Sequence, residues 1–146
     1  MHRLHQENKY VTLCNPISVA TGASVTPIAV DGTGFDRIAI FCQKGTQTGA
    51  TKNTIRVTLY KAGTSGGTYS KVTASDGTYA AVASSKVGIV IDASIDPASP
   101  FMKVYGTGGG LGTSAVIVAM LACLYKGSRS LPPTQEYTTT APVIIA

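Results

Sequence analysis

The sequence has no tryptophan, and only 13% of its 146 residues are charged, against about 25% in an average globular protein. Glycine and threonine are abundant instead, and they favour turns and strands respectively. Saccharide sites commonly use flat aromatic rings, so the lack of tryptophan argues against a glycan-binding module. The tyrosines are dispersed, and we expect Tyr60, Tyr69 and Tyr79 to form cross-strand pairs rather than a ligand platform.

Histidine is also scarce, because His2 and His5 near the N-terminus are the only two. A Ser-His-acid triad needs a histidine in the folded body, so nucleophilic hydrolysis has little support. His2 and His5 with Cys14 lack both a fourth ligand and a known metal-site spacing. Asp92 and Asp96 could pair as acid and base or hold calcium, but a solvated loop explains them better. We therefore expect no enzymatic activity, no metal and no cofactor.

The cysteines are too few and too scattered for a disulfide framework. Cys14, Cys42 and Cys123 form no C-x-x-C pair, which indicates reduced thiols. The first ten residues, MHRLHQENKY, lack the apolar segment of a signal peptide, so secretion by that route is not expected. The longest apolar run, residues 115–125, is about half of the ~20 residues that a membrane-spanning helix needs. No membrane association is expected.

Basic residues and glycines do not form a nucleic-acid or phosphate site. The net charge is +5, but no basic run exceeds two residues, so we expect no specific nucleic-acid binding. The glycine cluster at residues 106–112 fits no phosphate-loop motif and precedes no helix signature, so it is predicted to be a turn.

Alternating apolar residues predict strands along most of the chain. The clearest case is residues 54–61, where Ile55, Val57 and Leu59 share one face. Residues 114–125 are predicted as a strand, with a buried helix as the alternative, and residues 92–100 as a loop. The other expected strands are residues 10–13, 25–30, 35–43, 69–73, 78–82, 87–91 and 101–105.

Short strands with glycine turns and no amphipathic helix predict an all-β, single-domain β-sandwich, jelly-roll-like, with extended N- and C-terminal arms. The expected division is an N-terminal arm at 1–9, the sandwich at 10–126 and an extended C-terminal arm at 127–146. The C-terminal arm contains two adjacent prolines, a threonine triplet and an apolar tip.

Three blocks carry a resemblance to a known group of proteins: GFDRIAIFCQKG, TIRVTLYKAGTSGG and PFMKVYGTGGGLGTSAVIVAMLACLYKGSRSLPP. In their layout of strands and turns they resemble small tailed-phage virion proteins of the capsid decoration or cement type. The resemblance implies a protein on the outer capsid surface of the virion, assembled in the host cytoplasm. Such a protein bridges neighbouring copies of the major capsid protein, stabilises the head and has no catalytic residues.

On this hypothesis the two arms make the contacts. Arg3, Lys9, Lys126 and Arg129 would meet acidic capsid surface, and we expect a dimer or trimer on the assembled shell. The alternatives are a phage tail or fibre module that binds a receptor or glycan and, with less support, a nucleic-acid-binding barrel. The predicted apolar contacts are Val143, Ile144 and Ile145.

Overall fold

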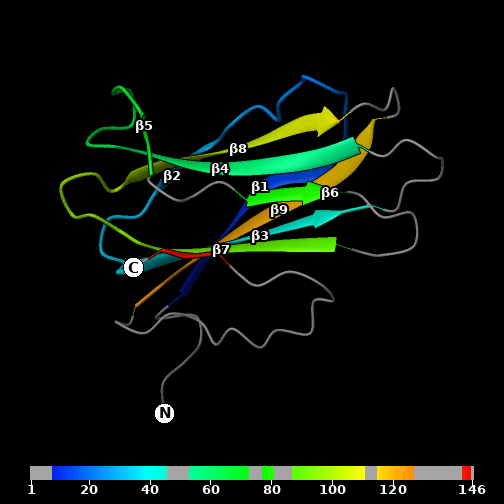
Figure 1. The fold of residues 1–146 in the computed structure, drawn as a ribbon. Helices are drawn as coiled ribbons and strands as arrows, with labels where there is room; N and C mark the ends of the chain where they lie inside the picture. The colour runs from blue at the N-terminus through cyan, green and yellow to red at the C-terminus, as the bar shows by residue number, and fades with distance from the viewer. Residues whose placement is uncertain are drawn as a thin grey trace, which may run out of the picture.

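In a computed structural model the chain forms a β-sandwich (Figure 1). The structure describes residues 8–45, 53–72, 77–80, 87–110, 115–126 and 143–145, and none of these is helical. The strands are β1 (Asn8–Val19), β2 (Ala29–Asp31), β3 (Arg37–Lys44), β4 (Asn53–Ala62), β5 (Ser70–Lys71), β6 (Gly77–Ala80), β7 (Val87–Ser94), β8 (Phe101–Gly110), β9 (Val116–Tyr125) and β10 (Val143–Ile145).

The strand order is that of a jelly roll. Sheet one has the order β1-β9-β3-β7-β10, and sheet two has β2-β8-β4-β5, with β6 also paired to β4. The chain alternates between the sheets from β1 to β4, stays in sheet two for β5 and β6, and alternates again from β7 to β9. Because β9 lies between β1 and β3, and β8 lies between β2 and β4, the two sheets are nested Greek keys. The predicted fold class is confirmed.

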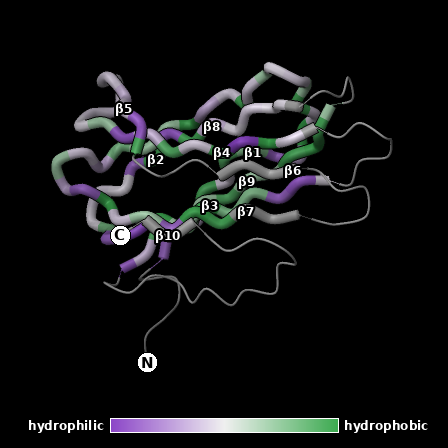
Figure 2. The backbone as a smooth tube through the Cα atoms, in the orientation of Figure 1, coloured by the Kyte–Doolittle hydropathy of each residue, from purple (hydrophilic) through white to green (hydrophobic). Residues whose placement is uncertain are grey.

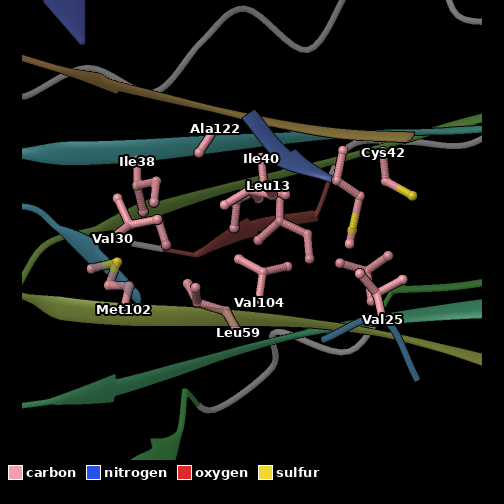
Figure 3. Packing of buried hydrophobic residues seen from close by; sticks show 14 of the residues in the cluster. Leu13, Val25, Val30, Ile38, Ile40, Cys42, Leu59, Met102, Val104 and Ala122 are labelled. Carbon is pink, nitrogen blue, oxygen red and sulfur yellow. The ribbon is translucent and has the colours of Figure 1, made fainter. Parts of the chain in front are cut away.

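The core lies between the two sheets, as Figure 3 shows. Alternation sends every second side chain of each strand inward, where β-branched and leucine side chains fill the space. Sheet one contributes Ile38 and Ile40, and sheet two contributes Leu59, Met102 and Val104, all less than 3% exposed. This continuous cluster holds the sheets face to face.

Strand β9 decides between the two structures predicted for residues 114–125. Its burial alternates along Val116–Tyr125, which a strand requires and a helix would not show. It lies between β1 and β3 in sheet one, and Figure 2 shows hydrophobic residues along both β9 and β3. The helix alternative is therefore wrong.

Strand β1 is longer than predicted because it does not end before Asn15 and Pro16. The strand continues to Val19, with register shifts between Thr12 and Cys14 and between Cys14 and Ile17. Proline has no amide hydrogen to donate, and it is tolerated at bulges and on edge strands. Since β1 is the edge strand of sheet one, Pro16 interrupts no central ladder.

The turn predicted at residues 106–112 is wrong for the part that the structure describes. Residues 106–110 are the second half of β8 and pair with β4. Glycine is needed because other groups pack against this strand from inside the sandwich. A Cβ on Gly106 would lie 3.2 Å from Cε of Met120, and one on Gly108 would lie 3.1 Å from the carbonyl carbon of Ala20.

Strand pairing also reaches into both predicted arms. Strand β1 begins at Asn8, so Lys9 pairs with Leu124 of β9 rather than lying in an arm of residues 1–9. Within the predicted C-terminal arm, Val143–Ile145 forms β10, which pairs in parallel with β7. Pairing with β9 and with β7 satisfies backbone hydrogen-bonding groups of these segments. The rest of both predicted arms, apart from Asn8, lies outside the described residues.

Candidate functional surfaces

The outer face of sheet one is largely apolar. Strand register places Thr12, Leu121, Phe41 and Val90 in one row across β1, β9, β3 and β7. The next row toward the β1 start runs from Tyr10 through Cys123 and Ala39. We call the following outward positions of sheet one the apolar face: Tyr10, Phe41, Val90, Ile117, Ala119, Leu121 and Cys123.

Several large side chains of the apolar face are accessible to solvent. Tyr10 and Ile117 are each 55% exposed and Leu121 is 38% exposed. Beside them a groove of about 510 Å³ follows the bulged part of β1. Contiguous exposed apolar surface on a soluble domain is typical of a protein-protein contact. The groove is lined by Thr12, Cys14, Asn15, Pro16, Phe41, Gln43, Ala119, Met120 and Leu121.

A buried ionic cluster closes one end of this face. Arg37 Nε donates to Asp92 Oδ1 and to the Tyr125 hydroxyl, both at 3.1 Å, and Arg37 also donates to Ser94 Oγ at 3.0 Å. The Tyr125 hydroxyl lies 2.7 and 2.8 Å from the two Asp92 oxygens. Asp92 is 1% exposed. The loop predicted for residues 92–100 is therefore wrong at its start, because this cluster and β3 pairing keep Asp92 within β7.

Burial and hydrogen bonds within the cluster leave the pKa values of Arg37 and Tyr125 raised, which favours the charged guanidinium and the protonated phenol. Burial lowers the pKa of Arg37, but hydrogen bonds to Asp92 and Tyr125 outweigh this and raise it. Burial and the hydrogen bond to Asp92 raise the pKa of Tyr125 to about 12. Asp96 does not pair with Asp92, because Asp96 Oδ2 lies 2.9 Å from Lys61 Nζ, and its hydrogen bond with Lys61 lowers the pKa of Asp96. The two aspartates thus contact different cations.

The three cysteines are free thiols, as the sequence predicted. Burial raises the pKa of Cys14 and of Cys123, and it raises the pKa of Cys42 to about 12. A thiol with a raised pKa is a poor nucleophile at neutral pH. No group of three histidine, cysteine or acidic residues within the described ranges could hold a metal ion. His2 and His5 lie outside those ranges.

We expect the free energy of unfolding to fall as pH rises from 9 to 12. The Cys42 thiol and the Tyr125 phenol have ordinary pKa values of 9.0 and 10.0, and each rises to about 12 in the fold. The unfolded chain then loses these protons first, so the stabilisation is complete below pH 9 and is lost toward pH 12. Urea unfolding midpoints at pH 8, 9, 10 and 11 measure this.

Cys42→Ala serves as the control for this pH dependence. The substitution leaves a small cavity and lowers stability at every pH. It should also make the free energy of unfolding fall less steeply between pH 9 and 12. A decline with the same slope in both proteins would contradict the assignment to Cys42.

The outer face of sheet two differs in character, because it carries tyrosines and cations. The rings of Tyr60 and Tyr105 meet edge to face, 5.0 Å between centroids. Lys103 Nζ lies 4.2 Å from the centre of the Tyr69 ring. The predicted set of Tyr60, Tyr69 and Tyr79 missed Tyr105, which is brought beside β4 by the long-range pairing of β8. The side chain of Tyr79 lies outside the described residues.

Those of the predicted contact residues that the structure describes lie near one end of sheet one. Lys9 lies at the start of β1, and Lys126 directly follows the end of β9; both are exposed. Strand β10 pairs with Ile91–Ala93 near the same end, where Arg37 pairs with both Ser94 and Tyr125. Lys9 Nζ also donates to the Asp31 carbonyl at 3.3 Å. Arg3 and Arg129 lie outside the described residues.

Comparisons with known proteins find structural likeness only. No protein-family model matches the sequence, and no curated protein matches it. Among solved structures, the IBDV viral particle is similar with a TM-score of 0.58 at 12% identity, over 82% of this chain and 31% of the other. The structure of the infectious bursal disease virus Gt strain is similar with a TM-score of 0.54 at 10% identity, over 82% of this chain and 33% of the other. The VP2 subviral particle of infectious bursal disease virus is similar with a TM-score of 0.50 at 13% identity, over 82% of this chain and 32% of the other.

These likenesses define the class of fold. The chain is a jelly-roll β-sandwich of the kind found in viral capsid proteins, and it spans about a third of the length of those chains. No helix among the described residues is long and apolar enough to cross a membrane.

Proposed function

We propose that this protein is a structural component of a virus particle, a decoration or cement protein that binds and bridges major capsid proteins. The observation that carries the proposal is the apolar face, an exposed hydrophobic sheet surface on a capsid-like jelly roll. Catalysis and cofactors have no part in this role. The capsid-like fold supports a role in a virus particle. The resemblance of the three sequence blocks to tailed-phage virion proteins supports a tailed-phage head as that particle.

The apolar face suits a partner that is itself a protein surface. Its central row runs from Thr12 through Leu121 and Phe41 to Val90 and contains no charged side chain. Docking there would therefore bury no charge without a partner. Tyr10, Ile117 and Leu121 are the most exposed large side chains of this face, so they supply apolar area that a partner could bury. The major capsid protein is the proposed occupant, and a dimer or trimer is expected on the assembled shell.

The end of sheet one that carries Lys9 and Lys126 adds positive charge to this docking surface. Lys9 and Lys126 would face acidic capsid groups, together with Arg3 and Arg129 from the chain segments beyond them. The tip Val143–Ile145 would add apolar burial next to β7. Many copies would bind only the assembled lattice, and each contact would shift the equilibrium away from disassembly, so weak single contacts suffice to stabilise the shell. We place the protein on the outer capsid surface, after assembly in the host cytoplasm.

The test measures binding to particles that have been stripped of this protein. We expect Ile117→Asp and Leu121→Asp to weaken binding by roughly a hundredfold or more, because each places a carboxylate in an apolar interface. Both side chains are exposed, so the fold should survive. Ile28→Asp is the matched control, since Ile28 is 47% exposed but lies outside sheet one. Its binding should equal that of the parent.

Copy number and heat stability complete the test. Hundreds of copies per particle, and a lower melting temperature of particles without the protein, are expected for a cement protein. If Ile28→Asp weakens binding as much as Ile117→Asp does, the apolar face is not the docking surface. A handful of copies per particle would instead favour the alternative of a tail or fibre module for a receptor or glycan.

A further inference from the structure

The outer edge of β1 offers backbone hydrogen-bonding groups to a further strand. Within the parts of the chain that the structure describes, β1 pairs only with β9 and ends sheet one on that side. No backbone hydrogen bond from a turn or loop of those parts reaches residues 8–19. An unpaired strand edge is a template to which another strand can add. The edge of β1 is therefore a candidate interaction surface in addition to the apolar face.

This edge is regular only along its first part. From Asn8 to Thr12 the register against β9 advances without a shift, and both shifts in β1 come after Thr12. Bulges and proline commonly keep a strand edge from pairing, and the later part of β1 has both, with Pro16 at the second shift. An added strand would therefore match residues 8–12, which we call the regular edge.

The side chains of the regular edge do little to prevent pairing. Lysine on an edge strand is a common protection, and Lys9 is the one charged residue here. Its Nζ donates to the Asp31 carbonyl of β2 at 3.3 Å, so the charge is turned toward sheet two. Tyr10, in the middle of the regular edge, is 55% exposed. An exposed aromatic ring at this position suits a partner strand, because cross-strand aromatic pairs stabilise sheets.

The regular edge is complementary to itself in the antiparallel direction. When two copies meet around a two-fold axis at Tyr10, Asn8 lies opposite Thr12 of the second copy. Lys9 lies opposite Val11, so no charged side chain is directly opposite another. The two Tyr10 side chains face each other at the axis, as an aromatic cross-strand pair. Parallel pairing in register would instead set the two Lys9 side chains side by side, which is unfavourable.

We propose that two copies of this chain pair through the regular edge of β1, antiparallel about a two-fold axis at Tyr10, and join the two copies of sheet one into one continuous sheet. The axis is perpendicular to the joined sheet, so both apolar faces point to the same side. The pairing itself does not depend on the capsid role. Its use in bridging rests on the proposed function, because each copy would dock one major capsid protein through its own apolar face.

The paired edge is short, so the dimer is weak in solution. Five residues of each copy take part, far fewer than the roughly 20–30 residues a side of a stable protein interface. On a shell, neighbouring copies are held at high effective concentration, and the same contact then forms readily. In solution we expect the dimer to become prominent only toward millimolar concentration.

Sedimentation equilibrium of the purified full chain, from micromolar to millimolar concentration, measures the dimer. Tyr10→Lys should weaken dimerisation roughly tenfold or more, because it places two lysines opposite each other and removes the aromatic pair. Thr26→Lys is the matched control and should stay within twofold, since Thr26 is exposed and lies outside both sheets. Urea midpoints confirm folding. If Tyr10→Lys does not fold, Thr12→Lys adds the same charge to the regular edge and decides the question.

Two further measurements distinguish the strand edge from the apolar face. Amide hydrogen exchange in residues 8–12 should be slower at millimolar than at micromolar concentration, whereas exchange in residues 14–19 should not change. Ile117→Asp should leave dimerisation within twofold, because Ile117 pairs with Ser18, beyond the regular edge.

Four results would overturn the proposal. One is a chain that stays monomeric at millimolar concentration. Another is equal weakening by Thr26→Lys, which would mean repulsion by net charge. A third is loss of the dimer in Ile117→Asp, which would mean contact through the apolar faces. The last is protection of residues 8–12 only on stripped particles, which would assign the edge to a strand of the capsid protein. Particle binding by Ile117→Asp is measured separately, so the pairing and the proposed function can fail independently.

Discussion

Replacing Asp92 by alanine should lower the free energy of unfolding by about 3–5 kcal/mol, the usual cost of breaking a buried ion pair. Asp92 is 1% exposed and accepts hydrogen bonds from both Arg37 and Tyr125. Without it, the Arg37 guanidinium stays buried at 6% exposure and loses its carboxylate partner. Desolvation of that charge is no longer offset by the ion pair, so most of the cost comes from the residue left behind.

Two further variants separate the ionic cluster from the general effect of losing an acid. Asp31→Ala removes an exposed carboxylate that accepts hydrogen bonds from the amide and the side chain of Thr33, and it should cost about 1 kcal/mol. Arg37→Met combined with Asp92→Leu removes both charges and should recover much of the lost stability. Chemical denaturation at pH 7 measures all three. Equal losses for Asp92→Ala and Asp31→Ala would show that the cluster does not stabilise the fold.

Gly108→Ala should lower the free energy of unfolding by about 3 kcal/mol, at the upper end of the range for overpacking. Alanine in a strand normally stabilises relative to glycine, so the sign of this effect is diagnostic. A Cβ at this position would lie 3.1 Å from the Ala20 carbonyl carbon and closer still to its oxygen. That carbonyl cannot move freely, because Gly108 also donates to Ala23 and accepts from Gly22.

Gly66→Ala is the matched control for this prediction. A Cβ on Gly66 would meet no atom within 4 Å, and its backbone does not have a positive φ. The substitution should be neutral or should stabilise by about 0.4–1 kcal/mol, since alanine restricts the unfolded chain. Thermal unfolding of the two variants gives the comparison. If Gly108→Ala were as stable as Gly66→Ala, the close contact between β8 and the segment before β2 would be wrong.

The strands themselves could be predicted, because their signal is local. Ile55, Val57 and Leu59 alternate with polar residues, and they face the core as expected. Where the predicted strand boundaries were wrong, residues distant in the sequence determined the actual ones. Pro16 interrupts no ladder because β1 is an edge strand, and Asp92 stays in β7 because it meets Arg37 and Tyr125. No local pattern signals either fact.

The candidate surfaces show the same division. Lys9 and Lys126 were selected from sequence as predicted contacts, and their position at one end of sheet one follows from the pairing of β1 with β9. Tyr105 was missed as a partner of Tyr60 because the two residues are far apart in the chain and are joined only by the pairing of β4 with β8.

The sequence by itself determined the all-β class, the positions of most strands and the residues that face the core, because side-chain alternation is a property of each strand alone. The tertiary structure alone decided the strand order, and with it the apolar face, the ionic cluster and the contact between Tyr60 and Tyr105. Each of these joins residues from different strands, and pairing between distant strands depends on packing and register across the whole sandwich.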